Sequence, residues 1–178
     1  MKDGGVGCIV NVCASVGGFG GTLELMKAYP FVYGAVGGHP DDAGIMTQDT
    51  LDEIRRLSHM EKMVAIGEIG LDYYWHKEEA EHKQQQEMFR AQMDIAREEK
   101  LPFMIHSRDA AEDTLEIVKE YIALQQMRYD FIIEMNIEDG SYLDQPTVRM
   151  LFQPLVENAI RYGLGDCLLY TSPSPRDT

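Results

Sequence analysis

The stretch MVAIGEIG, residues 63–70, is a short apolar run interrupted by one acid, Glu68. Runs of the same kind occur at GCIVNVCA (7–14), FVYGAVGG (31–38) and LPFMIH (101–106). Short runs that are apolar on both faces are typical of strands buried in a parallel sheet. The sequence therefore predicts four short buried strands.

Helical patterns separate and follow these runs. One helix is expected near residues 22–29, and the Thr-x-x-Glu spacing of Thr50 and Glu53 resembles a capping box that opens a helix to about residue 59. Residues 78–100 carry apolar side chains at helical spacing, and a further helix begins near Asp109. This strict alternation predicts an α/β fold with a parallel sheet, either doubly wound or closed as a barrel.

Three of the predicted strands end in potential metal ligands. His39 follows the strand at 31–38, Glu68 ends MVAIGE, and His106 ends LPFMIH, at intervals of 29 and 38 residues. Each interval is about one βα unit, and carboxyl ends of parallel strands form the site in such folds. The three side chains are therefore expected to converge. A carboxylate and neutral imidazoles suit a divalent metal.

Three ordered motifs carry a family resemblance: GGHP (37–40), AIGEIGLDYYW (65–75) and LPFMIHSRDAAEDTL (101–115). Together they resemble the TatD family of metal-dependent hydrolases over residues 4–120. The resemblance implies an incomplete TIM-like (β/α) barrel of parallel βα units. It also implies hydrolysis of DNA phosphodiesters with two divalent ions, Mg²⁺, Mn²⁺ or Zn²⁺.

Site residues follow from the same resemblance. Glu68 and His106 match metal ligands, and His39 matches a histidine of the active-site pocket, either in contact with substrate or behind the ligands. Substrate contacts are expected from residues beside these motifs: His39, Asp72, Tyr73 and Arg108. Arg108 could bind a phosphate oxygen in bidentate fashion or form an ordinary salt bridge. The predicted catalytic set is Glu68, His39 and Arg108.

The family's other metal-binding motifs are not matched in this sequence. The resemblance implies an H-x-H pair on an earlier strand, a later histidine and a closing T-D-x-P aspartate, whereas the chain holds five histidines and none of them form an H-x-H pair. We therefore expect a truncated hydrolase that is poorly active or inactive. His59, His76 and His82 have no such context and are expected to be exposed.

Residues 120–163 resemble a different family, the LytS/YesM-type sensor histidine kinases. The run QPLVENAI implies a nucleotide-binding helix with Asn158 and Glu157 near the magnesium of ATP, but the glycine boxes needed for turnover are missing. CLLYTSPSPRD (167–177) resembles a translated sequencing adapter. The predicted parts are thus a partial hydrolase barrel (1–120), a helix-strand-helix fragment of a histidine-kinase ATPase domain (121–166) and an adapter-derived tail (167–178). A kinase ATP-binding fragment and a non-functional chimera remain the alternative functions.

Composition limits the partners. The chain has 178 residues, 44% of them hydrophobic, and a net charge of −14, which disfavours non-specific nucleic-acid binding unless bound metal offsets it. No apolar run approaches the length of about 20 residues that a membrane span needs. Without a signal peptide or paired cysteines, the prediction is a cytoplasmic protein with reduced Cys8, Cys13 and Cys167.

Overall fold

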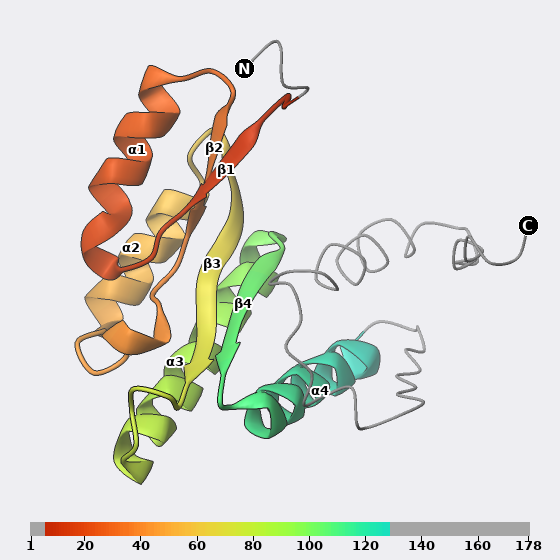
Figure 1. The fold of residues 1–178 in the computed structure, drawn as a ribbon. Coiled ribbons are helices and arrows are strands. Elements are labelled where there is room, and N and C mark those ends of the chain that lie inside the picture. The colour runs from red at the N-terminus through yellow and green to blue at the C-terminus, as the bar shows by residue number, and fades with distance from the viewer. Residues whose placement is uncertain (1–5, 129–178) are drawn as a thin grey trace, which may run out of the picture. The chain divides into compact units, whose positions relative to one another are not determined.

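The computed structural model describes residues 6–128, in which strands and helices alternate (Figure 1). Four strands form the sheet: β1 (Ile9–Val12), β2 (Val32–Val36), β3 (Met63–Asp72) and β4 (Phe103–Arg108). Four α-helices connect or follow them: α1 (Phe19–Ala28), α2 (Gln48–Ser58), α3 (Glu79–Glu99) and α4 (Ala111–Arg128). Two short 3-10 helices, η1 (Val16–Gly18) and η2 (Pro40–Asp42), precede α1 and α2.

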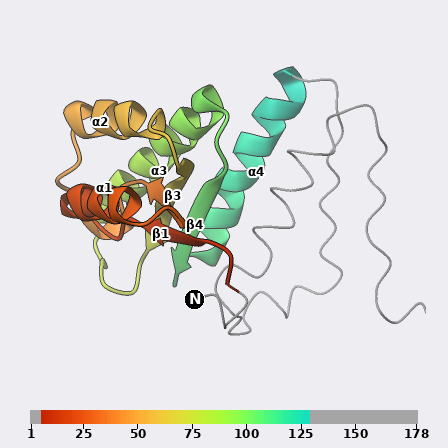
Figure 2. The ribbon, with the colours of Figure 1, turned by 90° about the horizontal axis from the view of Figure 1, so that it is seen from above.

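The sheet is parallel throughout and its strands follow chain order, β1-β2-β3-β4. Seen from above, the helices lie outside the row of strands, with α1, α2 and α3 on one side of it (Figure 2). All carboxyl ends of the strands consequently meet at the same edge of the sheet. The prediction of a parallel α/β fold is confirmed.

The core lies between β3 and the helices that cover it. Ile66, Ile69 and Leu71 of β3 are fully buried, as is Phe89 of α3. On α3, the buried residues recur at intervals of three, four and seven, as an amphipathic helix requires. Lys100 then adopts a left-handed conformation (φ 56°) that ends the helix, and β4 begins at Phe103.

The start of α2 differs from the prediction. Thr47, not Thr50, is the N-cap: its extended backbone places its hydroxyl to accept from the Thr50 amide, and the Thr50 hydroxyl accepts from the Thr47 amide in return. Glu53 instead forms an ion pair with Arg56. The predicted Thr50–Glu53 capping box is therefore wrong, because a second threonine three residues earlier closes the reciprocal pair.

Strand β1 is less buried than its sequence predicts. Ile9 and Val10 are 41% and 40% exposed, and β1 pairs only with β2 within the described residues. The prediction of a buried strand at residues 7–14 is wrong for these two side chains. An apolar sequence is enough to form a strand, but burial also requires neighbours on both sides.

Several predictions fall on residues 129–178, outside the described part of the chain. These are the helix-strand-helix fragment beyond Arg128, the nucleotide-binding residues Asn158 and Glu157, and the adapter-derived tail. Within the described part, α4 runs as one helix through residue 120, the predicted boundary between the hydrolase and kinase-type parts. Among the described helices, none has the length and apolar character needed to cross a membrane.

Candidate metal centre

His39, Glu68 and His106 come together at the carboxyl-terminal side of the sheet. Each offers one ligand atom, and these atoms all lie within 4.8 Å of one another. Nε2 of His39 lies 3.3 Å from Nδ1 of His106, which in turn lies 3.3 Å from Oε1 of Glu68. Two imidazoles and a carboxylate at this separation can share one divalent cation.

Three neighbouring strands supply these side chains. His39 follows β2 and caps η2, where its Nδ1 accepts from the Asp41 amide at 3.3 Å. Glu68 lies within β3, which continues to Asp72 and so runs two residues past the predicted end of that strand. His106 lies on β4 with Gly70 of β3 as its register partner. The three residues, about one βα unit apart in the sequence, therefore lie close together in the structure.

Asp72 holds His106 from behind. The carboxylate is 2% exposed; its Oδ2 lies 3.1 Å from Nε2 of His106, and its Oδ1 accepts from the amides of Tyr74 and Trp75. Burial alone would raise the pKa of Asp72, but these amide donors and His106 outweigh it and lower the pKa. Such a carboxylate fixes the orientation of an imidazole ligand. Its burial fits this role, and the substrate contact of Asp72 stays a prediction.

The pKa values of the two histidines shift in opposite directions. Burial, together with the charge of neighbouring His106, lowers the pKa of His39. Burial also opposes a charge on His106, but the carboxylates of Glu68 and Asp72 outweigh it and raise the pKa of His106. Because metal ligation needs neutral imidazoles, cation binding at this cluster is favoured as the pH rises.

The Tyr73 hydroxyl forms hydrogen bonds within the protein, and its substrate contact stays a prediction. The hydroxyl donates to Oδ2 of Asp113 at 2.7 Å and accepts from Gln86 at 2.8 Å. Burial is the largest cause that raises the pKa of Tyr73 to about 12, and Asp113 adds to it. The ring stacks on His82 with centroids 3.6 Å apart. Tyr73 therefore ties β3 to α3 and α4 instead of offering a free hydroxyl.

The remaining histidines divide in exposure. The side chain of His59 is 57% exposed, as predicted. His76 and His82 were also predicted to be exposed, but both are half-buried, so the prediction is wrong for these two. His76 lies between Asp41 and Glu81 at 3.1 and 3.2 Å, and these carboxylates raise its pKa against the effect of burial.

Arg108 lies two residues after His106 on β4, and its guanidinium stacks on an aromatic ring. Its side chain is exposed at the end of β4, and its guanidinium carbon lies 3.9 Å from the ring centre of Tyr74. It forms no ion pair with any residue in the described range 6–128, so the salt-bridge interpretation has no partner there.

Sequence reasoning missed two buried glutamines of α3 that fix the strand ends. Gln85 accepts from the Asp72 amide at 2.8 Å and donates to the Asp72 carbonyl, and Gln92 makes the same pair with Gly38 at 2.6 and 3.1 Å. Both are 1% exposed. The signal was available, because the two lie seven residues apart on the buried face of the helix with Phe89 between them.

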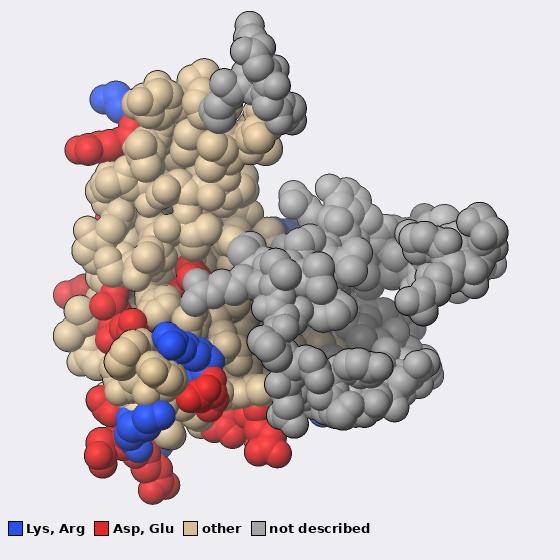
Figure 3. All heavy atoms as spheres, viewed as in Figure 1, with Lys and Arg blue, Asp and Glu red and all other residues tan. Residues whose placement is uncertain are grey.

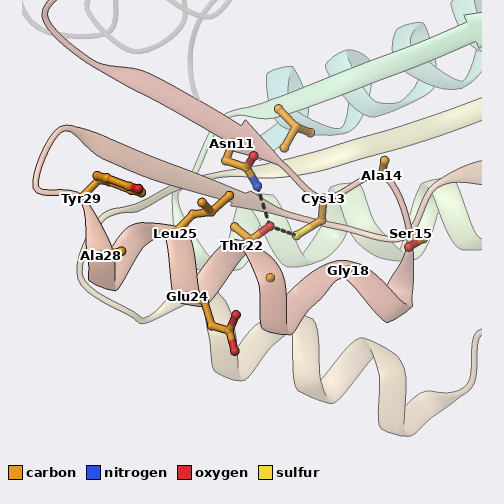
Figure 4. A pocket seen from close by; sticks show the side chains of 12 residues that line it. Asn11, Cys13, Ala14, Ser15, Gly18, Thr22, Glu24, Leu25, Ala28 and Tyr29 are labelled. Atoms are coloured by element: carbon orange, nitrogen blue, oxygen red, sulfur yellow. Dashed lines mark hydrogen bonds between the residues drawn. The ribbon is translucent and has the colours of Figure 1, made fainter. Parts of the chain in front are cut away.

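A groove of about 620 Å³ lies elsewhere, along β1 and α1 (Figure 4). In it Thr22 accepts from Asn11 at 2.8 Å and lies 3.1 Å from the sulfur of Cys13. Burial raises the pKa of that thiol. None of the three clustered side chains lines this groove, so the candidate metal centre is separate from it.

A family model described as "TatD related DNase" matches residues 1–133. The chain belongs to the TatD family. An uncharacterized metal-dependent hydrolase, YabD of Bacillus subtilis (strain 168), is 49% identical over 98 residues, which are 55% of this chain and 38% of that protein. The 3'-5' ssDNA/RNA exonuclease TatD of Salmonella typhimurium is 33% identical over 100 residues, covering 56% and 38%.

The fold agrees with this membership. The crystal structure of YJJV, a TatD homolog from Escherichia coli K12, matches with a TM-score of 0.60 and 28% identity over 66% of this chain and 45% of that one. The four parallel βα units thus resemble half of a TatD-family barrel. The chain spans less than half the length of these three relatives.

Proposed function

We propose that this chain binds a divalent metal ion through His39, Glu68 and His106 and hydrolyses phosphodiester bonds of nucleic acids. The observation that carries the proposal is the convergence of these three ligand atoms within 4.8 Å, from three strands of a TatD-family fold. When bound there, a divalent ion would supply an acidified water and would polarise a phosphoryl oxygen.

The surrounding residues support that role. Asp72 holds the ring of His106 through Nε2, which leaves Nδ1 facing Glu68 and His39. Nε2 of His39 faces the cluster, and ligation through it requires the proton to be on Nδ1, where Oδ2 of Asp41 lies 3.3 Å away and can accept it. Each imidazole thus presents one nitrogen to the shared space, as a metal ligand must. Arg108 keeps a positive charge beside the cluster and can attract a phosphate.

Nucleic acid is the proposed substrate class because related proteins carry that activity in their names. The Salmonella relative is named a 3'-5' ssDNA/RNA exonuclease, and a human relative, 32% identical over 139 residues, is named a 3'-5' RNA nuclease. With a net charge of −14, general attraction to phosphate is weak. General attraction to phosphate therefore contributes little, and binding depends on local contacts beside the candidate metal centre, such as those of Arg108.

Metal binding and cleavage test the proposal together. Calorimetry with Mn²⁺ is expected to give about one ion per chain, because three ligands form one cluster. Cleavage of a fluorescent single-stranded oligonucleotide is expected to be slow and to need the metal. Glu68→Gln keeps the shape of the side chain but removes its charge, and should weaken Mn²⁺ binding at least about 10-fold and reduce cleavage in parallel.

Glu24→Gln is the matched control, because Glu24 lies on α1 at the separate groove. It should bind Mn²⁺ and cleave as the unchanged chain does. Equal Mn²⁺ affinity and equal cleavage in the Glu68→Gln and Glu24→Gln variants would contradict the proposed site.

The nucleotide-binding role of Asn158 and Glu157, together with the kinase-type and adapter-derived segments, stays a prediction. We propose, as a second and separate reading of the chain, that these segments add no ATP turnover. In calorimetry with Mg²⁺ and ATP, the unchanged chain and an Asn158→Ala variant are expected to behave alike. ATP binding by the unchanged chain that is lost in Asn158→Ala would favour the kinase alternative.

A further inference from the structure

The turn after β3 exposes two aromatic rings. Tyr74 is 43% exposed and Trp75 66% exposed, and their rings meet edge to face with centroids 4.6 Å apart at 89°. Their backbone amides are both bound by Oδ1 of Asp72, which fixes the start of the turn. A large exposed tryptophan contributes little to a core, so a fixed and exposed pair of rings indicates a binding surface.

Two cations border these rings. The guanidinium carbon of Arg108 lies 3.9 Å from the ring centre of Tyr74 and 5.5 Å from that of Trp75. Nζ of Lys77 lies 5.5 Å from the ring centre of Tyr74. Most arginines of the described region are paired with carboxylates, whereas Arg108 is held by the rings. Nζ of Lys77 also donates to the Tyr73 carbonyl at 2.7 Å, and within residues 6–128 neither cation forms an ion pair, so aromatic faces and available positive charge occur together in an otherwise acidic chain.

This surface borders the metal centre. Arg108 and His106 are two residues apart on β4 and so point to the same side of the sheet. Asp72 contacts His106 through one oxygen and the aromatic turn through the other. On the face drawn in Figure 3, Lys and Arg side chains interrupt the Asp and Glu at the lower end, where β3 and β4 end in Figure 1.

We propose that Tyr74, Trp75 and Arg108 form a stacking platform for an unpaired base of a single-stranded nucleic acid whose phosphate reaches the metal centre. The choice of nucleic acid rests on the proposed function. Bases stack on tryptophan, tyrosine and guanidinium planes without regard to sequence, and the two cations neutralise adjacent phosphates. Base-paired DNA keeps its bases inside the helix, so the platform selects single strands and strand ends.

Trp75 is the chain's one tryptophan, so intrinsic fluorescence reports on the platform directly. Titration of the full chain with a short oligothymidylate in EDTA should quench this fluorescence to saturation. An abasic oligonucleotide of equal length carries the same phosphates and should bind about 10-fold more weakly. Equal affinity for both oligonucleotides would overturn the platform, because binding would then depend on phosphate alone.

Variants separate stacking from folding and from metal binding. By anisotropy of a labelled oligothymidylate, Trp75→Ala should weaken binding about 10-fold, whereas Trp75→Phe should retain most of the affinity. Tyr29→Ala is the control, because Tyr29 is 47% exposed but lies in the turn before β2, at the other end of the sheet. Unchanged oligonucleotide affinity in Trp75→Ala would also overturn the proposal.

Mn²⁺ affinity distinguishes this failure from failure of the proposed function. Trp75→Ala should bind Mn²⁺ as the unchanged chain does, since the ligands are untouched. Loss of stacking with intact metal binding supports the platform, and intact stacking with absent metal binding would count against the proposed hydrolase alone. If the exposed rings instead contact a second protein copy, sedimentation should show a dimer that Trp75→Ala abolishes, and that outcome would overturn a nucleic-acid role.

Discussion

Strands β1 and β3 have similar apolar sequences but different surroundings. β3 pairs with β2 on one side and β4 on the other, and Ile66, Ile69 and Leu71 are fully buried. β1 pairs with β2, and its Ile9 and Val10 are about two-fifths exposed. Glu68, the proposed metal ligand, lies on the strand with two neighbours. Packing from both sides fixes a side chain to the precision that a shared ligand position needs.

The same contrast extends to backbone contacts. Beside β3, the side chains of Gln85 and Gln92 bind both backbone groups of Asp72 and Gly38. Beside β1, the groove along α1 leaves open space around the helix glycines. The same substitution should therefore change the free energy of unfolding differently, in size or in sign, at β3 and at the groove between β1 and α1.

Gly70→Ala should give the largest loss of stability. Gly70 has φ +144°, a conformation that other residues rarely adopt, and an added methyl group would collide with the carbonyl of His106. We expect the free energy of unfolding to fall by about 3 kcal/mol or more, because strain and the backbone collision add. Urea denaturation measures the loss, and an unchanged midpoint would contradict the close β3–β4 approach.

Ile66→Ala and Val10→Ala compare the two strands directly. Ile66 is fully buried and Val10 is 40% exposed. Truncation of Ile66 should cost about 3 kcal/mol through lost burial and a cavity, whereas truncation of Val10 should cost less than about 1 kcal/mol. Urea denaturation of the paired variants gives the difference. Similar costs would mean that β1 is as well packed in solution as β3.

The sequence predicted those features that depend on chain order and spacing. His39 follows β2, and Glu68 and His106 lie on the next two strands, so the geometry of parallel units brings all three to one edge of the sheet. The contacts of nearby residues such as Asp72 and Tyr73 depend on the direction in which each side chain points, and sequence spacing does not determine that direction. The spacing thus did not predict the hydrogen bond from Tyr73 to Asp113 or the burial of Asp72 behind His106, and the substrate contacts of both residues stay predictions.

Exposure was hard to predict for a related reason. The burial of Ile9 depends on which strands pair with β1, and the sequence of β1 contains no information on that. The half-burial of His76 depends on Asp41, 35 residues away in sequence, which no local pattern links to it. Gln85 and Gln92 were predictable in principle, because a polar side chain on the apolar face of a helix must find a partner.

Gly21→Ala should give the smallest effect and the opposite sign. Gly21 lies in α1 at the groove beside β1, and an added methyl group meets no atom within 4 Å. Alanine restricts the unfolded chain more than glycine and favours the helix, so the free energy of unfolding should rise by about 0.5–1 kcal/mol. Urea denaturation of Gly21→Ala and Gly70→Ala side by side compares the two regions, because both variants add the same methyl group. If Gly21→Ala instead lowers the free energy of unfolding, other atoms must occupy the groove in solution. β1 would then be packed as well as β3, and the two strands would differ only in which parts of the chain cover them.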